Sequence, residues 1–465
     1  MADSSLGLPL CINIFFMITK LLSIVALVGI SLFSFNLVLL PDQGIILYDS
    51  KRIFLCFLIV LSCLFIVVSE NFREKLALRF LSSNFNIKLF TIVFFLLAFL
   101  SDISGDYFTQ SITNYFYYFG LFLLILIFSI GRPAKLHFRF LSIISTLCFL
   151  SVFVGYSVAN FLGDGAGIFH ILSYANPRFM NQVQIWLMIP LLYIALISRS
   201  KLAFIFPILN CAAIVALDAR GLAVASFGGI LLWCLIDRRR APEILKTALI
   251  CFSTGAVISY IFLTPLPSLL LHGEQSRSLL DMRGTTEDRL SLWKYAIDMS
   301  SFWGLGSDGF VCNSVREVRP HNSILKIILN WGVVPAFCYI CLCLILLKQV
   351  FQEKNYRYRI IGLSLLSGLA HSLISGVLDS PLSLLLACLF TGWFCSRAKY
   401  DSIAPLNKWY HGFLIVMCSL SIYSVTLKVY ERVSNDFYRW NVEEVVRPQF
   451  WQVIIVRQEI WILIQ

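Results

Sequence analysis

The sequence predicts an all-α protein, a polytopic bundle of about 12 to 13 transmembrane helices with one large outer loop containing short helices. Three observations predict it. Of the 465 residues, 58% are hydrophobic and only 14% are charged, whereas soluble domains carry about 25% charged residues. Apolar runs long enough for a membrane-crossing helix recur along the chain. The alternating pattern of a membrane barrel is missing. Together they exclude a soluble enzyme, a DNA-binding protein and a disordered scaffold.

Thirteen apolar segments are predicted to cross the membrane as helices. They are 21–40, 53–69, 89–103, 114–130, 139–162, 182–198, 202–217, 221–236, 247–264, 323–347, 360–378, 381–395 and 412–428. The first is expected to stay as an anchor, because it is too long for a signal peptide and no small-residue cleavage site follows. Of the 14 cysteines, all but Cys312 fall in apolar segments, so they are interpreted as small core residues and not as a disulfide framework.

The basic residues predict the orientation of these helices. The net charge is +11, and 21 of the 37 basic residues fall in one alternate set of connections. These connections are 1–20, 70–88, 131–139, 199–201, 237–246, 348–359 and 396–411. The positive-inside rule makes this set cytoplasmic. The long connection 265–322 then lies outside despite its six basic residues, because long loops cross the membrane regardless of charge.

The predicted organisation has four parts. Residues 1–264 form N-terminal transmembrane helices, 265–322 form the large outer loop, and 323–428 form C-terminal transmembrane helices. The tail, 429–465, mixes aromatic and basic residues. Among its aromatic residues are Trp440, Phe450, Trp451 and Trp461, and its arginines are Arg432, Arg439, Arg447 and Arg457. This composition is typical of an amphipathic segment on the outer membrane surface.

A loop of this length is the natural place for function. Thr285 or Thr286 can cap a helix on which Arg289 and Trp293 share a face. An arginine beside an aromatic ring at the membrane surface suits a headgroup site. The alternative is an interfacial helix whose arginine merely reaches toward water.

The segment 304–309 of this loop matches G-x-G-x-x-G. A dinucleotide fingerprint needs a preceding strand and a following helix in a βαβ unit, and neither is expected here. The segment is therefore interpreted as a tight glycine turn that brings backbone close to a ligand or another helix.

His321 closes the loop, next to Asn322 and the predicted span 323–347. The positive end of a helix dipole lowers the pKa of an imidazole, which favours the free base at neutral pH. Such a base could accept the proton of an acceptor hydroxyl. The alternative is a histidine that only sits at the interface.

Two shorter outer connections also carry arginine. Arg220 lies in a turn so short that it must stay near the membrane boundary, where it needs a partner, either Asp218 or an anion. Arg178 lies in an amide-rich segment with Asn181, before the span 182–198. For both, the alternative is a charged turn that only fixes topology.

Up to seven arginines are predicted to face outward: Arg178, Arg220, Arg277, Arg283, Arg289, Arg316 and Arg319. Guanidinium groups bind phosphate in a bidentate manner. The outer acidic residues lack metal-ligand spacing, and no second histidine stands near His321. These residues predict a pyrophosphate site without a metal or cofactor.

The order of residues around this site resembles the C-terminal signature of the O-antigen ligase and polymerase superfamily. The matching pattern is Arg289-x-x-x-Trp293, Gly304-x-Gly306, His321-Asn322-x-x-Leu325 and Trp331-Gly332. Arg220-Gly221 resembles the earlier arginine motif of that family. Two departures exist: Asp218-Ala219 precedes Arg220 where many relatives have serine, and the acidic residue often found before the glycine of the last motif is replaced by Asn330-Trp331.

The resemblance implies a glycosyltransferase of the GT-C kind in the bacterial inner membrane, with a periplasmic active site. Its donor would be a glycan on undecaprenyl pyrophosphate, and its acceptor a hydroxyl of lipid A-core, another glycan or a protein. His321 would activate the acceptor, while Arg220 and Arg289 would bind the pyrophosphate. Further substrate contacts are expected from Arg178, Asn181, Arg283, Trp293, Arg319 and Asn322.

An O-antigen ligase of lipopolysaccharide biosynthesis is the leading interpretation. An O-antigen polymerase and a protein O-oligosaccharyltransferase of the same superfamily remain open. A more distant alternative is a flippase or transporter of lipid-linked sugars, which predicts charges buried in several spans. A third is a structural membrane protein, in which His321 and Arg289 would be freely replaceable.

Overall fold

The protein is described from a computed structural model that covers residues 8–35, 46–163, 167–172, 174, 176–198, 200–273, 285–313, 319–398 and 407–436. Within these residues the chain is all-helical and contains no strand. The predicted all-α class is therefore confirmed. The predicted site residue Arg283 and the tail beyond 436 lie outside the described residues.

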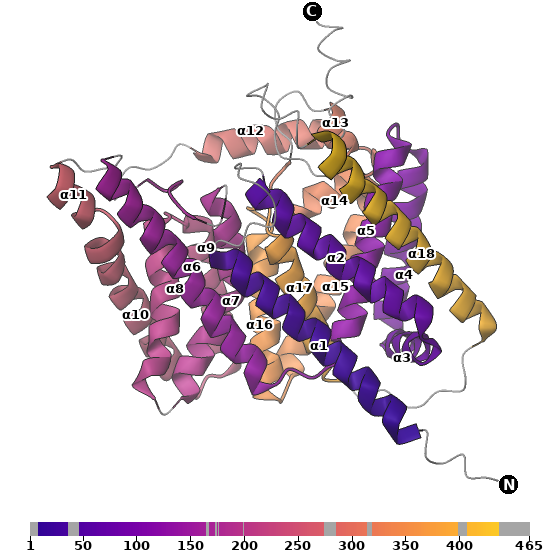
Figure 1. Cartoon of the computed structure of the whole chain (residues 1–465), viewed down its shortest axis with the longest axis horizontal. Helices are drawn as coiled ribbons and strands as arrows, with labels where there is room; N and C mark the ends of the chain where they lie inside the picture. Colours follow the sequence, from indigo (N-terminus) through magenta and orange to yellow (C-terminus); the bar gives the residue numbers. More distant parts are fainter. Residues whose placement is uncertain are drawn as a thin grey trace, which may run out of the picture.

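A helix stands at each of the thirteen predicted spans (Figure 1). These helices are α1 (Leu8–Phe35), α2 (Ile46–Val68), α4 (Phe85–Ser104), α5 (Phe108–Phe128), α6 (Lys135–Leu162), α7 (Pro177–Ile197), α8 (Ile205–Ala216), α9 (Arg220–Ile236), α10 (Ala241–Ile258), α15 (Val333–Gln352), α16 (Tyr356–His371), α17 (Pro381–Cys395) and α18 (Lys408–Glu431). In the described part of the chain, nine helical segments are long and apolar enough to cross a membrane. The helices α8, α9 and α17 are apolar but shorter. These features support a multi-pass membrane protein.

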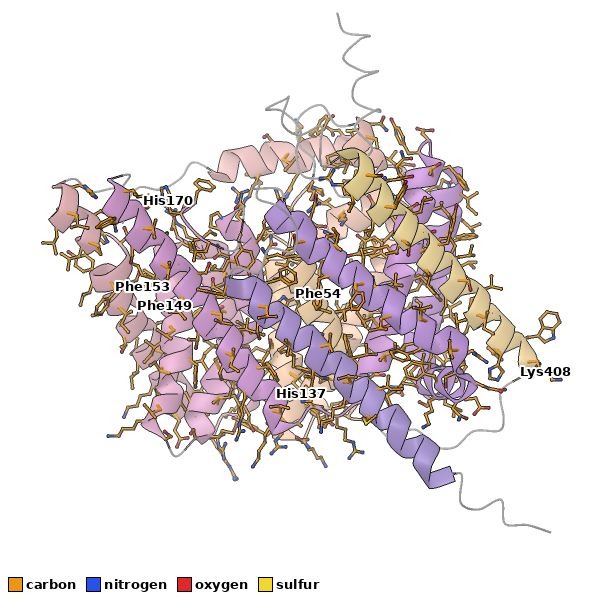
Figure 2. The ribbon with its side chains drawn as sticks, viewed as in Figure 1. Phe54, His137, Phe149, Phe153, His170 and Lys408 are labelled. Atoms are coloured by element: carbon orange, nitrogen blue, oxygen red, sulfur yellow. The ribbon has the colours of Figure 1, made fainter. Side chains whose placement is uncertain are left out.

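The remaining helices are short. They are α3 (Glu70–Leu81), α11 (Leu266–His272), α12 (Thr285–Asp298), α13 (Gly309–Asn313), α14 (Ser323–Trp331), the 3-10 turn Lys201–Phe204 and the π-helical turns Ser259–Leu263 and Arg432–Asp436. Helix α12 lies across one end of the bundle, at about the same height as α13 and above α14, and α3 lies near the opposite end (Figure 1). Figure 2 places His170 toward the α12 end and His137 toward the other. This matches the predicted alternation of loops between two sides.

The predicted span 323–347 is wrong in one respect, because the chain breaks at Gly332 into α14 and α15. Gly332 has φ +89°, a left-handed conformation that side chains disfavour. The break lets two backbones interlock: the Leu305 amide donates to the Leu329 carbonyl at 2.8 Å, and the Val333 amide to the Phe302 carbonyl at 3.0 Å. A Cβ on Gly332 would lie 2.2 Å from the Phe302 oxygen.

Gly304 lies in the loop segment that pairs with Gly332. Its φ is +83°, and a Cβ there would lie 2.5 Å from the Asn330 carbonyl oxygen. The predicted glycine turn is therefore confirmed, and what it approaches is another helix. We call the pairing of Phe302–Leu305 with Leu329–Val333 the glycine contact. Buried Asp102 of α4 fastens it by accepting from the Ser307 amide at 2.6 Å and the Trp331 indole at 3.1 Å.

The centre of the bundle is made by α7, most of whose residues are buried. The Trp186 indole donates to Ser383 Oγ of α17 at 2.8 Å, and Ser364 Oγ of α16 donates to the Trp186 carbonyl at 2.6 Å. Small residues and hydroxyls of this kind hold helices together where no water competes. These contacts join α7 to α16 and to α17.

One expectation about the tail is wrong. Arg432 was expected on the outer membrane surface, but only 2% of its side chain is exposed. Its Nε pairs with Asp49 Oδ2 of α2 at 2.9 Å. A buried guanidinium needs such a carboxylate, because an unpaired charge in an apolar interior is strongly unfavourable.

Candidate functional site

Helix α12 forms over the predicted residues and packs on the loop beneath it. Leu292 and Ala296 are buried against Phe310 and Leu329. Leu290 and Ile297 of the same helix are exposed. Trp293 stays on the inner face, where its indole nitrogen donates to the Pro320 carbonyl at 2.8 Å. The helix is thereby joined to the residue that precedes His321.

His321 occupies an unusual backbone position at the start of α14. Its φ is +51°, and the other described non-glycine residues with positive φ are Asp218 and Asp308. Asn322 then caps α14, because its Oδ1 accepts from the Ile324 and Leu325 amides at 3.0 and 3.1 Å. The substrate contact of Asn322 stays a prediction. Its side-chain oxygen Oδ1 is already used to cap α14. A left-handed histidine is held there only by its surroundings, as is common at functional sites.

Burial lowers the pKa of His321 to about 4, and the positive charges of Arg178, Arg319 and Arg289 add to the effect. The carboxylate of Asp379 acts in the opposite direction. The direction of the shift agrees with the expectation from sequence, whereas its causes are burial and arginines in place of the helix dipole. The imidazole is consequently the free base at neutral pH.

The arginines reach His321 from three separate segments. Arg178 stands in the first turn of α7, where its amide donates to Asn176 Oδ1 at 2.9 Å. Arg289 comes from α12, and Arg319 from the chain just before α14. Burial lowers the pKa of Arg289, and the charge of Arg178 lowers it further, so the two guanidiniums lie close enough to repel. Gathered positive charge of this kind attracts an anion.

Arg220 and Asn181 stand in different surroundings. Arg220 pairs with Asp218 through Nε–Oδ1 at 2.9 Å and Nη2–Oδ2 at 3.2 Å, and 49% of its side chain is exposed. Asp218 is thus one of the two predicted partners. Gly221, the neighbour of Arg220, faces His371, whose Nε2 would lie 3.5 Å from an added Cβ. Asn181 is buried, and within the described residues its Oδ1 has no hydrogen-bond partner.

A polar pocket opens beside the His321 segment. It is lined by Arg52, Asn114, Tyr117, Tyr118, Asp308, Phe310, Val311, Arg319, Pro320, Lys326, Leu329, Asn330, Leu378 and Asp379. Of the predicted site residues that the structure describes, only Arg319 lines it. The side chains of Arg178, Arg289 and His321 do not.

The polar groups of this pocket are bonded to one another. Lys326 Nζ bonds to the Asp379 carboxylate and to the Tyr118 hydroxyl, the latter at 3.0 Å. Arg52 donates to the Tyr117 hydroxyl at 2.6 Å and to the Asp379 carbonyl at 2.5 Å. Burial raises the pKa of Asp379, but the charges of Lys326 and Arg319 outweigh this and hold it at about 2. Asp379 is therefore ionised at neutral pH.

The sequence analysis missed these groups. Arg52 and Lys326 lie beside or within predicted apolar spans, and Asp379 directly follows the predicted span 360–378. One signal could have found them, since an ionisable residue inside a membrane segment is a functional candidate by default. Lys326 lies five residues after His321, within the predicted span.

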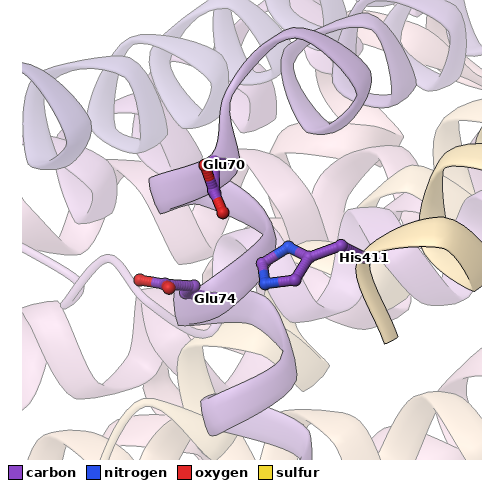
Figure 3. Close-up of side chains that lie close together, drawn as sticks. All are labelled: Glu70, Glu74 and His411. Atoms are coloured by element: carbon purple, nitrogen blue, oxygen red, sulfur yellow. The ribbon is translucent and has the colours of Figure 1, made fainter. Parts of the chain in front are cut away.

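A second cluster lies near the α3 end of the bundle. Glu70, Glu74 and His411 place ligand atoms within 4.8 Å of one another (Figure 3). Arg73 Nε, however, donates to His411 Nδ1 at 3.3 Å. A neutral ring that accepts at Nδ1 carries its proton on Nε2, so neither nitrogen is left to bind a metal. The cluster is a charged hydrogen-bonded group on this part of the surface.

No family model matches the chain, and no curated protein matches it. A functional assignment therefore depends on the arrangement around His321 and on the sequence motifs that contain Arg289, Trp293 and His321.

Proposed function

We propose that the protein is a membrane glycosyltransferase that moves a glycan from undecaprenyl pyrophosphate to an acceptor hydroxyl. The proposal places it in the bacterial inner membrane as an O-antigen ligase with lipid A-core as acceptor, GT-C-like in topology and with a periplasmic site. The observation that supports it is the convergence of Arg178, Arg289 and Arg319 on the neutral imidazole of His321, beside a polar pocket.

In the proposed reaction, His321 takes the proton of the acceptor hydroxyl as general base. The hydroxyl oxygen forms a bond to the anomeric carbon of the donor sugar. The bond from that carbon to the phosphate oxygen breaks, and its electron pair leaves with undecaprenyl pyrophosphate. Fixed guanidiniums act most strongly on the charge that develops on this leaving group.

Binding of the donor should change the pKa of His321 through electrostatic interactions. In the free protein, burial and three arginines hold the pKa of His321 at about 4, which makes it a weak base. A bound pyrophosphate would offset the arginine charges, so the pKa of His321 would rise toward its ordinary value. The base would thus gain strength when the donor is in place, and this would limit wasteful hydrolysis in its absence.

The more distant alternative, a flippase, predicts charges buried in several spans. Buried charges lie in α2, in α4 at Asp102 and in α18 at Lys428, each near one end of its helix. The charged residues of α2 are Asp49, Lys51 and Arg52, and all lie in its first two turns. This placement favours an enzyme whose charges meet at one end of the bundle. Polymerase and protein transferase activities use the same chemistry and differ only in the acceptor.

The proposal is tested by replacing His321 with alanine in the full-length protein. Glycan transfer should fall by at least about a hundredfold, the usual contribution of a general base, while membrane insertion is unchanged. His170→Ala, a histidine at the same end of the bundle, is the matched control and should retain transfer. Transfer near the wild-type rate in His321→Ala would refute the base assignment.

A deletion strain then identifies the acceptor. Loss of all O-antigen-capped lipopolysaccharide indicates a ligase, whereas a core with one repeat unit indicates a polymerase. A change confined to a glycoprotein indicates a protein transferase. An unchanged surface polysaccharide and glycoprotein profile would count against all three.

A further inference from the structure

Two arginines share one tyrosine ring at the end of the bundle opposite α12 (Figure 1). The guanidinium carbon of Arg240 lies 5.2 Å from the centre of the Tyr356 ring, and that of Arg359 lies 5.9 Å from it. Arg240 precedes α10, whereas Tyr356 and Arg359 stand in the first turn of α16. Trp233 of α9 holds the ring, because its indole nitrogen donates to the Tyr356 hydroxyl at 3.1 Å. Three helices therefore meet at these four residues, which we call the Tyr356 cluster.

The two positive charges of this cluster are not neutralised by nearby carboxylates. Within the described residues, neither Arg240 nor Arg359 forms an ion pair. Glu353 gives Arg359 only its backbone carbonyl, at 3.0 Å from Nε and 2.6 Å from Nη2. The carboxylate of Glu353 pairs instead with Arg397 at 3.3 Å. Like charges held beside one ring repel each other, and a bound anion would relieve that repulsion.

The surface around the cluster is also basic. The connections 237–246 and 348–359, which supply Arg240 and Arg359, hold eight basic and only three acidic residues. The exposed basic residues next to the cluster are Arg238, Arg239, Lys354 and Arg357. Positive charge gathered from two connections attracts an anion to this place. The positive-inside rule predicts that this end of the bundle faces the cytoplasm.

Exposed apolar side chains beside the cluster indicate that the anion belongs to a lipid. Leu235, two residues after Trp233 on α9, is 62% exposed, and Leu249 of α10 is 68% exposed. An acyl chain can lie along such residues while its headgroup stays at the level of the arginines. Basic pockets between membrane helices on the cytoplasmic side bind phospholipid headgroups in this manner. Guanidinium groups suit the phosphate of such a headgroup, because they bind its oxygens in a bidentate manner.

We infer that the Tyr356 cluster binds the phosphate of an acidic phospholipid from the membrane leaflet at this end of the bundle. Arg240 and Arg359 donate to the phosphate oxygens, and the acyl chains lie against the exposed leucines of α9 and α10. The lipid thereby joins α10 to α16. The inference does not depend on the proposed reaction, because the cluster and His321 lie at opposite ends of the bundle.

The test uses the full-length protein in a neutral detergent. Tetraoleoyl cardiolipin is titrated into it, and binding is followed by native mass spectrometry and by thermal unfolding. Dioleoyl-phosphatidylcholine is the comparison lipid, because it has the same acyl chains and no net charge. The variant is Arg240→Gln. The matched control is Arg239→Gln, which removes the same charge from the preceding exposed position.

Cardiolipin should bind the wild type and raise its melting temperature, because a ligand that binds only the folded state stabilises it. Phosphatidylcholine should do neither. Arg240→Gln should raise the Kd for cardiolipin about tenfold, the effect of losing a hydrogen bond to a charged group, while Arg239→Gln should bind as the wild type does. Equal losses in the two variants would reduce the attraction to overall charge and overturn the site. Equal binding of the two lipids would also overturn it.

Two further measurements complete the test. Arg359→Gln should weaken cardiolipin binding as Arg240→Gln does, so the result does not depend on the folding of one variant. Unchanged binding in both would overturn the inference. Inorganic phosphate distinguishes a lipid from a free anion, and it should leave the melting temperature of the wild type unchanged. Stabilisation by phosphate equal to that by cardiolipin would overturn the lipid assignment.

Discussion

The indole nitrogen of Trp293 donates to the carbonyl oxygen of Pro320 at 2.8 Å. This bond ties α12, which lies across the end of the bundle, to the residue before the left-handed His321. The backbone of His321 is therefore held from two sides, by α12 through Pro320 and by α14 through the cap at Asn322. Rigid support of this kind is what a precisely placed base requires.

Trp293→Phe should test this support. The ring remains, but the donor to Pro320 is lost, and a hydrogen bond of this kind contributes about 1 kcal/mol. We expect kcat for glycan transfer to fall about fivefold with donor KM little changed. Trp303→Phe, an exposed tryptophan in the same loop, is the control. Equal effects of the two variants would show that the Trp293 bond has no special part in placing His321.

Arg289→Gln should move the pH dependence. The Arg289 charge helps to lower the pKa of His321, so its removal should raise that pKa above about 4. Because the base works only when unprotonated, kcat/KM of the wild type should fall as pH drops through about 4, and the fall in the variant should begin at higher pH. Lys294→Gln, which removes an exposed charge from the same helix, should leave the profile in place. A variant profile that is unshifted or moves to lower pH would contradict the electrostatic account.

Gly332→Ala should disrupt the glycine contact. A Cβ would lie 2.2 Å from the Phe302 carbonyl oxygen, and alanine disfavours φ +89°. We expect a loss of about 2 kcal/mol or more in stability, measured by thermal unfolding in detergent. Gly228→Ala in α9 is the control, because no atom lies within 4 Å of its added Cβ. Equal melting temperatures for the two variants would mean that the loop adapts without strain.

The contributions of Lys326 and Asp379 to the free energy of unfolding should be coupled. Lys326→Met leaves the Asp379 carboxylate largely buried without its ammonium partner, which costs about 3 kcal/mol for a buried pair. Adding Asp379→Asn removes the charge and should restore part of that stability. A double-mutant cycle on unfolding midpoints measures the coupling, and purely additive losses would argue that the pair is not energetically joined.

Replacing Arg220 and replacing Asp218 should have different effects on donor binding. The pair is half exposed, so breaking it costs under about 1 kcal/mol. If Arg220 turns from Asp218 to the donor, Arg220→Ala should raise the donor KM about tenfold, whereas Asp218→Ala should leave it unchanged or lower it. Equal losses in both variants would reduce the pair to a structural turn.

Hydropathy was sufficient to locate the helices at the thirteen predicted spans, because each apolar run must satisfy its own backbone as a helix. The break at Gly332 was not predicted from hydropathy, since both α14 and α15 are apolar and only the close approach of Phe302 demands the kink. The buried position of Arg432 was equally invisible, because its carboxylate partner Asp49 lies far away in the sequence.

For the site, the loop motifs predicted Arg289, Trp293 and His321, and the structure brings these three together with Arg178 and Arg319. The sequence could not place Arg220, because its partner depends on how a short turn bends. It also could not reveal the pocket, whose walls come from α2, α5 and α14 and from the turn at Asp379. Contacts between segments far apart in the chain leave no local pattern.

The buried ion pair between Asp49 and Arg432 joins residues 383 positions apart. Asp49 stands one helical turn before Arg52, which forms part of the pocket wall. During synthesis, α2 therefore enters the membrane before its partner Arg432 has been made. The ion pair that holds this end of α2 can form only after α18 has been inserted. We therefore expect the pocket beside Arg52 to reach its final structure only in the last stage of assembly.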